Sequence, residues 1–302
     1  MAKKTTALAV ADSFQLVDRY AGLDPEMMEE LQDQMEDLDN DSGILCRKIK
    51  VPSGGSLAYV VQGEDDGDED YQKEIKGVVI FTHRLNGYWP GAFGEGDTNA
   101  PPVCSSMDGE KGRLADGSLP VTQEGELITC ENCPFNQYGS AVDQKGNASR
   151  GKACKNMRRI YLMMDQDPNV YQLTVPPTSI REVSAQMKKI LAEGVPYTGL
   201  IVKLTLEKAK NAGGIEYAKV AIKKAGLLPP EVAKQATALR REIKAQYMNM
   251  KLTFDDYATT PVESAADSGP RPAGKPVDVS ADDFNDGYQD AQPSGDEELP
   301  FG

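Results

Sequence analysis

The chain is poor in the residues and motifs on which most enzymes depend. Its 302 residues include one histidine, His83, and one tryptophan, Trp89. We find no P-loop, no G-x-S-x-G nucleophile elbow and no H-x-E pair of the zinc deaminases. Long apolar runs are missing too, since nothing approaches the ~20 apolar residues of a transmembrane helix. The sequence therefore predicts neither an enzyme nor a membrane partner, although its scattered carboxylates leave an Asp/Glu-dependent nuclease open.

A secretory signal is also missing from the N-terminal residues. Met1 to Lys4 precede a short apolar run that ends before Asp12, and no cleavage signal follows it. We therefore expect a cytoplasmic protein, in a compartment that keeps thiols reduced.

Cysteine is scarce but concentrated. Four of the five cysteines are spaced C-x25-C-x2-C-x20-C, at Cys104, Cys130, Cys133 and Cys154. The two-residue spacer of the middle pair is typical of a metal site, and tetrahedral zinc with sulfur ligands at ~2.3 Å is the usual occupant. Because four thiolates would close the coordination shell, the pattern predicts structural zinc. A disulfide pair or four unrelated thiols are the alternatives, and Cys46 is interpreted as a buried small residue.

The net charge of −14 is unevenly distributed. Residues 23–74 carry 16 acidic and 4 basic side chains, and residues 255–302 carry 12 and 2. Residues 75–254 carry 24 basic side chains against 17 acidic ones. A basic middle between acidic flanks indicates an anionic ligand for the middle and separate roles for the flanks.

The hydrophobic periodicity changes along the chain and predicts a mainly β protein with some helix. An amphipathic helix at 25–39 either packs on its own domain or covers a basic groove or a partner. The acidic run from Glu64 to Asp70 reads as a solvated loop. We expect strands at 44–51, 57–61, 76–85, 157–164, 170–175, 197–206 and 215–222, a helix from Pro176–Thr178 to Gly194, and a last helix from Pro230 to about Met250.

This order favours a five-stranded Greek-key barrel of the oligonucleotide-binding (OB) type, with a zinc-binding insertion, flanking helices and a disordered acidic tail. Residues 1–42 would form an N-terminal segment that carries the acidic helix. Residues 43–252 would form the binding domain, interrupted by the zinc insertion at about 95–156. Residues 253–302 are rich in Asp, Ser, Gly, Pro and Ala and would form the disordered tail.

The basic middle combines cations with aromatic rings, which is the combination that holds single-stranded nucleic acid. Core packing is the alternative for each ring, and at least one of Arg158 and Arg159 should face solvent, because neighbours on a strand point to opposite sides. The candidate DNA-binding residues are Arg84, Tyr88, Trp89, Phe93, Arg158, Tyr161, Lys203, Lys208, Lys210, Tyr217, Lys219 and Lys223.

The last residues carry a resemblance to a known family. They read Asp296, Glu297, Glu298, Leu299, Pro300, Phe301 and Gly302. This end resembles the C-terminal tip of bacterial and phage single-stranded DNA-binding proteins, although Gly302 follows the phenylalanine that ends the family's chains. The stretch from Cys104 to Cys154, with Asn132 to Asn136, is similar to the zinc-containing forms from phages and mobile elements.

The resemblance implies a non-catalytic, sequence-independent single-stranded DNA-binding protein of phage or mobile-element replication and recombination, acting in a bacterial host cell. Asp296 to Phe301 would dock replication or recombination proteins, with carboxylates directed at a basic rim and Leu299 and Phe301 in an apolar pocket. The alternative is a zinc-ribbon adaptor that binds a replication or transcription protein and no DNA. The sequence leaves the oligomeric state open.

Overall fold

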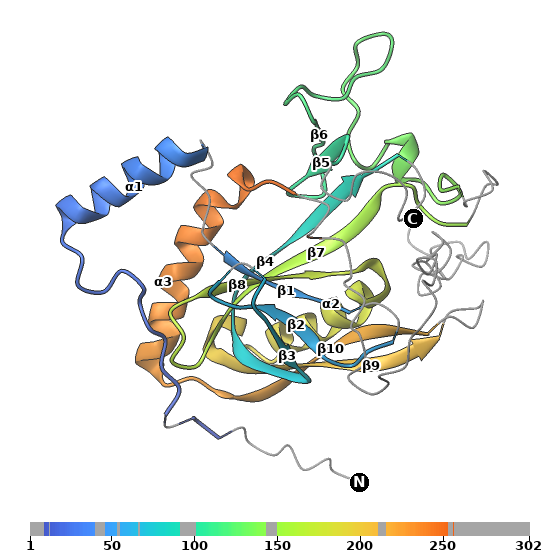
Figure 1. The fold of residues 1–302 in the computed structure, drawn as a ribbon. Helices are drawn as coiled ribbons and strands as arrows, with labels where there is room; N and C mark the ends of the chain where they lie inside the picture. Colours follow the sequence, from blue (N-terminus) through green and yellow to red (C-terminus); the bar gives the residue numbers. More distant parts are fainter. Residues whose placement is uncertain are drawn as a thin grey trace, which may run out of the picture.

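A ten-stranded mixed sheet organises the described part of the chain (Figure 1). The computed structural model describes residues 9–11, 13–39, 46–52, 55–65, 67–90, 101–142, 150–210, 216–252 and 256. Eight strands follow the order β10-β9-β4-β7-β8-β1-β2-β3, while β5 pairs with β4 and β6 pairs with β5. All of these pairs are antiparallel except β1 with β8. The mainly β class expected from the sequence is confirmed.

The strands differ widely in length, from the two residues of β6 to the 15 residues of β4. The strands are β1 (Cys46–Lys50), β2 (Tyr59–Gln62), β3 (Glu69–Gln72), β4 (Glu74–Tyr88), β5 (Cys104–Ser106), β6 (Arg113–Leu114), β7 (Lys155–Met164), β8 (Val170–Val175), β9 (Leu200–Lys210) and β10 (Glu216–Leu227). The helices are α1 (Pro25–Asp39), α2 (Pro177–Ala192) and α3 (Pro230–Gln246), with short 3-10 turns η1 (Pro134–Asn136), η2 (Tyr197–Gly199) and η3 (Tyr247–Asn249). None of the described helices is long and apolar enough to cross a membrane.

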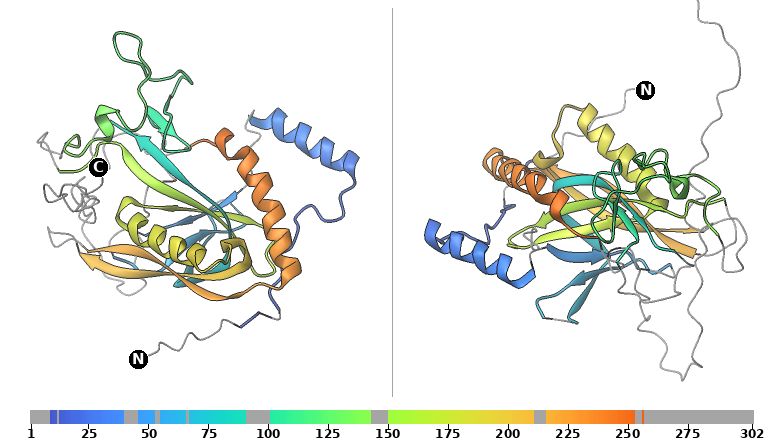
Figure 2. Two further views of the ribbon diagram at one scale, coloured as in Figure 1. Left: turned by 180° about the vertical axis from the view of Figure 1, so that it is seen from behind. Right: turned by 90° about the horizontal axis from the view of Figure 1, so that it is seen from above.

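Two helices cover opposite faces of the sheet (Figure 2). In β7, Ile160 and Leu162 pack in one core with Val183 of α2, whereas Tyr161 and Met163 pack in a second core with Ile243 of α3. Because successive side chains of a strand point to opposite faces, α2 and α3 must lie on different sides. We call these the α2 face and the α3 face.

The sheet curls around its α2 face into a half-barrel. Strands from both ends of the sheet contribute to one core: Ile49 and Val61 from β1 and β2 share it with Val202 and Val220 from β9 and β10. The hydroxyl of Tyr59 on β2 donates to the carbonyl of Thr205 on β9 at 3.1 Å. The curl therefore brings the two ends of the sheet into contact.

Several local expectations are confirmed and others are corrected. Helix α1 begins where predicted, since the Asp24 carboxylate accepts the Met27 N–H at 2.9 Å as an N-cap. The acidic run was expected to be a loop throughout, but Glu69 and Asp70 belong to β3, where they pair with Gln62 and Val61. Pairing with a neighbouring strand thus overrides the low strand propensity of the acidic residues.

The two ends of the described chain also depart from expectation. The segment before α1 lacks an apolar period, yet Phe14 is buried in the α3-face core and Val10 bridges to Leu227. Asp256, which the sequence assigns to the tail, has a side chain only 3% exposed. The rest of the expected tail, including the tip from Asp296 to Phe301, lies outside the described residues.

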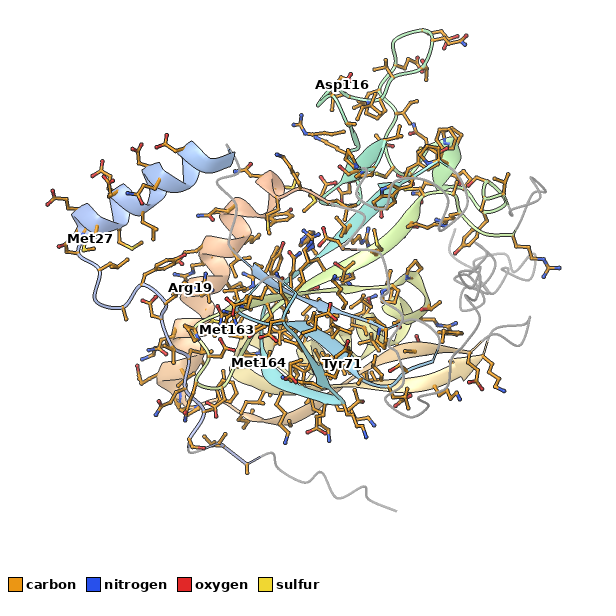
Figure 3. All side chains as sticks on the ribbon, in the orientation of Figure 1. Arg19, Met27, Tyr71, Asp116, Met163 and Met164 are labelled. Carbon is orange, nitrogen blue, oxygen red and sulfur yellow. The ribbon has the colours of Figure 1, made fainter. Side chains whose placement is uncertain are left out.

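The four clustered cysteines belong to a lobe between β4 and β7, which we call the cysteine lobe (residues 101–142 and 150–154). It lies at the ends of these two strands, with Asp116 at its outer part (Figure 3). Its buried apolar residues are Met107, Cys130, Ala141 and Cys154. Its exposed apolar residues are more numerous: Val103, Leu119, Val121, Leu127, Phe135, Tyr138 and Val142. The cysteine lobe thus has little core of its own.

Candidate nucleic-acid interface

The end of β4 brings the four cysteines to one region. Cys104 on β5 stands opposite Tyr88, and Lys155, which follows Cys154, stands opposite Gly87 on the other side of β4. Cys104 and Cys154 therefore flank the same strand end. The Cys154 N–H donates to the carbonyl of Phe135, two residues after Cys133, at 2.8 Å.

The electrostatics of the thiols also reflect this proximity. Burial, together with the nearby Cys130 and Cys133 thiols, raises the pKa of Cys104 to about 11. Burial likewise raises the pKa of Cys154 to about 12, with contributions from the other three thiols. In the part of the chain that the structure describes, no three His, Cys, Asp or Glu side chains already stand as a metal-holding group. The lobe gathers the four thiols around one strand end, and a bound cation would have to draw them closer.

Two aromatic rings stack beside the cysteines. Tyr88, at the end of β4, lies 4.4 Å from Phe135 between ring centroids, with the planes 15° apart. Phe135 is 45% exposed, so the outer part of its ring is open to solvent. Tyr138, also in the cysteine lobe, is 46% exposed, and the Lys152 ammonium lies 4.8 Å from its ring centroid. Of these three rings, only Tyr88 is among the DNA contacts expected from the sequence; Phe135 and Tyr138 are not.

Trp89 packs against a small hydrophobic core, although its glycine-rich sequence context predicts a more exposed ring. It is half-buried and packs against the small core of Leu85, Met107, Met157 and Leu252. A Cβ on Gly87 would come within 2.5 Å of the Trp89 ring, so glycine at this position gives the indole its space. Phe93, the other aromatic expected in this loop, lies outside the described residues.

Arg84 and Arg158 form a pair of cations on neighbouring strands. They are register partners between β4 and β7, so their side chains emerge side by side on the α2 face. Arg84 is exposed, whereas Arg158 is half-buried. Burial lowers the pKa of Arg158, and the charge of Arg84 lowers it further.

Within the described chain, this pair makes its side-chain hydrogen bond to a neutral group and not to a carboxylate. Arg158 Nη1 donates to the Thr82 hydroxyl at 3.3 Å, and its buried Nε has no hydrogen-bond partner. Neither guanidinium forms an ion pair with a carboxylate of the described residues. Two adjacent like charges that lack a counter-charge favour an external anion.

Tyr88 lies four residues beyond Arg84 along β4, and residues of the same parity share a face. At ~3.3 Å per residue the two positions are about 13 Å apart. We call Arg84, Arg158, Tyr88 and Phe135 together the arginine–aromatic face.

The lysines of the β9–β10 hairpin differ from this pair, because each one that the sequence selects contacts a glutamate. Lys208 and Lys210 share Glu216 at 2.5 and 3.2 Å. The remaining pairs are Lys203 with Glu74 at 2.8 Å, Lys219 with Glu182 at 2.6 Å and Lys223 with Glu207 at 3.9 Å. Such exposed pairs stabilise by only ~0.2–1 kcal/mol, so they can open, but they reduce the positive potential of the hairpin. Tyr217, on the same hairpin, is half-buried.

Two expectations about β7 are corrected by burial. Tyr161 was selected as a DNA contact, but it is 0% exposed in the α3-face core and stacks on Phe81 at 6.1 Å. At least one of Arg158 and Arg159 was expected to face solvent, yet Arg158 is half-buried and Arg159 is 0% exposed. Helix α3 packs over Tyr161 and the Asp256 carboxylate pairs with Arg159, and no strand periodicity reveals such covering.

His83 is a core residue in this structure. Its Nδ1 lies 2.6 Å from the Met107 carbonyl and 2.7 Å from the Arg84 carbonyl, so Nδ1 carries the proton. Burial lowers the pKa of His83 to about 4, and the charge of Arg159 lowers it as well. His83 is therefore neutral in the folded protein at pH 7.

Comparison with known proteins gives no further assignment: no family model matches the chain, and no curated protein or solved structure matches it significantly.

Proposed function

We propose that this protein binds single-stranded DNA without sequence specificity, through the arginine–aromatic face. The observation that carries the proposal is the juxtaposition of Arg84 and Arg158, which pair with no carboxylate of the described residues, with the stacked rings of Tyr88 and Phe135. Phosphates would bind the guanidinium groups, and unpaired bases would stack on the open side of Phe135. Neither contact distinguishes one base from another, so binding would tolerate any sequence.

Structural zinc at Cys104, Cys130, Cys133 and Cys154 is part of the same proposal. The four thiols come from separate segments that meet at the end of β4, and the cysteine lobe has few buried apolar residues to hold it. A bound zinc would cross-link these segments and fix Phe135 against Tyr88. The metal would have no catalytic role, and the protein would be no enzyme.

The wider proposal concerns the biological setting. A curled sheet with a lobe inserted between two strands suits an OB-type barrel that carries a zinc insertion. The tip from Asp296 to Phe301 would recruit replication or recombination proteins of a phage or mobile element. The first point rests on the order of the elements and the curl of the sheet, and the second rests on the sequence resemblance.

The direct test is a titration of a fluorescently labelled 30-nucleotide oligo-dT, followed by anisotropy. We expect binding that weakens with salt, at least tenfold weaker binding to a duplex of equal length, and a large loss in the Tyr88→Ala/Phe135→Ala double variant. The matched control is Tyr71→Ala, which removes a ring that is 50% exposed on β3, at the far edge of the sheet. No binding to oligo-dT at low salt would refute the proposal.

A second candidate, the zinc-dependent adaptor, is favoured by one observation. The cysteine lobe has five aliphatic side chains that are 44% to 53% exposed: Val103, Leu119, Val121, Leu127 and Val142. Exposed apolar clusters are typical of protein-binding surfaces. The adaptor predicts that oligo-dT leaves the anisotropy unchanged, whereas single-stranded DNA binding predicts that the anisotropy rises.

A further inference from the structure

An ion-pair cluster on the α3 face is unrelated to the arginine–aromatic face. Lys48 on β1, Gln172 on β8 and Arg159 on β7 come from three adjacent strands, with Lys48 directly opposite Gln172. Their polar ends converge on the carboxylate of Asp256. We call Lys48, Arg159 and Gln172 the Arg159 site.

The Asp256 carboxylate bridges the three side chains. Its Oδ1 accepts the Gln172 Nε2–H at 2.8 Å and lies 3.6 Å from the Lys48 Nζ. Its Oδ2 lies 3.1 Å from the Arg159 Nη2. The side chains of Arg159 and Asp256 are 0% and 3% exposed, so this carboxylate neutralises a fully buried guanidinium.

Within the described chain, the Asp256 carboxylate nevertheless leaves several buried polar atoms of the Arg159 site without a hydrogen bond. Within the described chain, the buried Nε, Nη1 and Nη2 atoms of Arg159 meet no acceptor with hydrogen-bond geometry, although Nη2 lies 3.1 Å from Asp256 Oδ2 and the guanidinium also interacts with the Tyr161 hydroxyl. The buried Oε1 atom of Gln172 accepts no hydrogen bond from the described residues. Buried polar groups are nearly always paired, so each of these atoms indicates a ligand with more hydrogen-bonding groups than a carboxylate has.

The missing acceptors at Arg159 and the missing donor at Gln172 specify the chemistry of that ligand. Guanidinium nitrogens require acceptor oxygens, and the fork of an arginine suits a tetrahedral oxyanion. Gln172 Oε1 requires a donor, which an ionised carboxylate lacks. A phosphate that keeps one proton offers several acceptor oxygens and one O–H donor in the same group. Sulfate and phosphodiesters offer no such donor at neutral pH.

We propose that the Arg159 site is a receptor for a protonated phosphate group, and that Asp256 occupies it as an internal substitute. The ligand is inorganic phosphate or a singly protonated terminal phosphate, such as the 5′ end of a strand. Its oxygens bind Arg159 and Lys48, and its O–H donates to Gln172 Oε1. Binding displaces the Asp256 carboxylate from these three side chains. The site lies apart from the arginine–aromatic face and does not depend on the proposed function.

The test compares thermal unfolding of the Asp256→Ala variant in phosphate and in sulfate at equal ionic strength and pH 7. At a phosphate concentration about ten times the dissociation constant, we expect the Tm to rise by roughly 3–6 °C over sulfate. Wild type should respond less, because phosphate must displace Asp256. The control Glu216→Ala also removes a carboxylate, from two exposed lysines, and should show no preference for phosphate. Adding Arg159→Met to Asp256→Ala should abolish the response.

Equal Tm values for Asp256→Ala in phosphate and sulfate would overturn the proposal. If Asp256→Ala does not fold in sulfate, folding that phosphate restores and sulfate does not would support it. If Asp256→Ala folds in neither salt, the same comparison is made with Asp256→Asn, which keeps a hydrogen-bonding side chain of the same size. The absence of a phosphate-specific rise there would likewise overturn the proposal.

Two oligonucleotides identify the source of the phosphate. A larger Tm rise of Asp256→Ala with 5′-phosphorylated oligo-dT than with 5′-hydroxyl oligo-dT assigns the site to strand ends. Equal rises, together with a response to inorganic phosphate, assign it to free phosphate. The inorganic-phosphate experiment contains no nucleic acid, so its outcome is separate from that of the proposed function.

Discussion

Removing the charges of Arg84 and Arg158 tests the proposed interface most quantitatively. We would replace both residues with glutamine, which keeps much of the side-chain stem and removes the positive charge. The two guanidinium groups are register partners on β4 and β7, and they have no carboxylate partner in the described chain. Their loss should therefore leave no unpaired counter-charge behind. Because like charges that face each other across strands destabilise a sheet, the free energy of unfolding should stay constant or rise slightly.

The expected effect on DNA binding follows from counterion release. For single strands, log K falls with log salt by about 0.7 for each phosphate that the protein neutralises. Two lost contacts should therefore reduce the slope by about 1.4. Each charge-assisted hydrogen bond contributes about 1.5 kcal/mol, so the double variant should bind roughly 100-fold more weakly at low salt.

The assay is anisotropy of labelled oligo-dT, with dissociation constants measured between 50 and 200 mM salt. Arg241→Gln is the matched control, since Arg241 is exposed on α3, on the other face of the sheet. It should change the slope little. A double variant whose slope and affinity equal those of wild type would refute the assignment of phosphate contacts to this pair.

Three further predictions concern the remaining parts of the account. Metal analysis of the purified protein should find one zinc ion per chain. The Cys133→Ser variant should lose this zinc, and the Cys46→Ala variant, which changes the fifth cysteine, should keep it. Equal zinc contents in the two variants would contradict the four-cysteine site. The pKa of His83 lies near 4 in the fold, below the usual ~6.5, so as pH falls from 6.5 toward 4 only the unfolded state gains this proton and stability is lost. The loss at pH 4 approaches roughly 3 kcal/mol in urea unfolding, and His83→Gln should remove this part of the pH dependence; an unchanged pH profile would contradict the burial argument. Finally, Lys208→Ala/Lys210→Ala should weaken oligo-dT binding less than twofold, because Glu216 already pairs with both lysines; a loss as large as that of the arginine variant would move the interface to the hairpin.

The sequence predicts most of the regular elements because their signals are local. The Asp24–Pro25 start of α1, the alternating strand β8 and the proline that opens α3 each depend on residues within a few positions. The parallel pairing of β1 with β8 and the addition of β3 depend on partners far away in the chain. No local pattern reports such pairing, and the seven strands expected from the sequence therefore lack β3, β5 and β6 of the ten observed in the described chain.

The candidate site was predictable to a similar degree. The cysteine spacing and the cations of β4 and β7 could be read directly, and so could Tyr88. Phe135 was hidden in a loop whose position against Tyr88 depends on the chain's path through the cysteine lobe. Burial of Tyr161 and Arg159 was missed because it depends on α3 and on Asp256, which is almost a hundred residues later. Pairing of Lys208, Lys210 and Lys223 with glutamates depends on the register of β9 and β10, whereas Lys203 and Lys219 pair with Glu74 of β4 and Glu182 of α2.

The measurement that tests the central claim most directly is ultraviolet cross-linking of oligo-dT to the full-length protein, with the linked residues identified by mass spectrometry. The account predicts cross-links at Phe135 or Tyr88, which zinc removal should weaken. Cross-links confined to the β9–β10 hairpin, or their complete absence under conditions where oligo-dT binds, would contradict it.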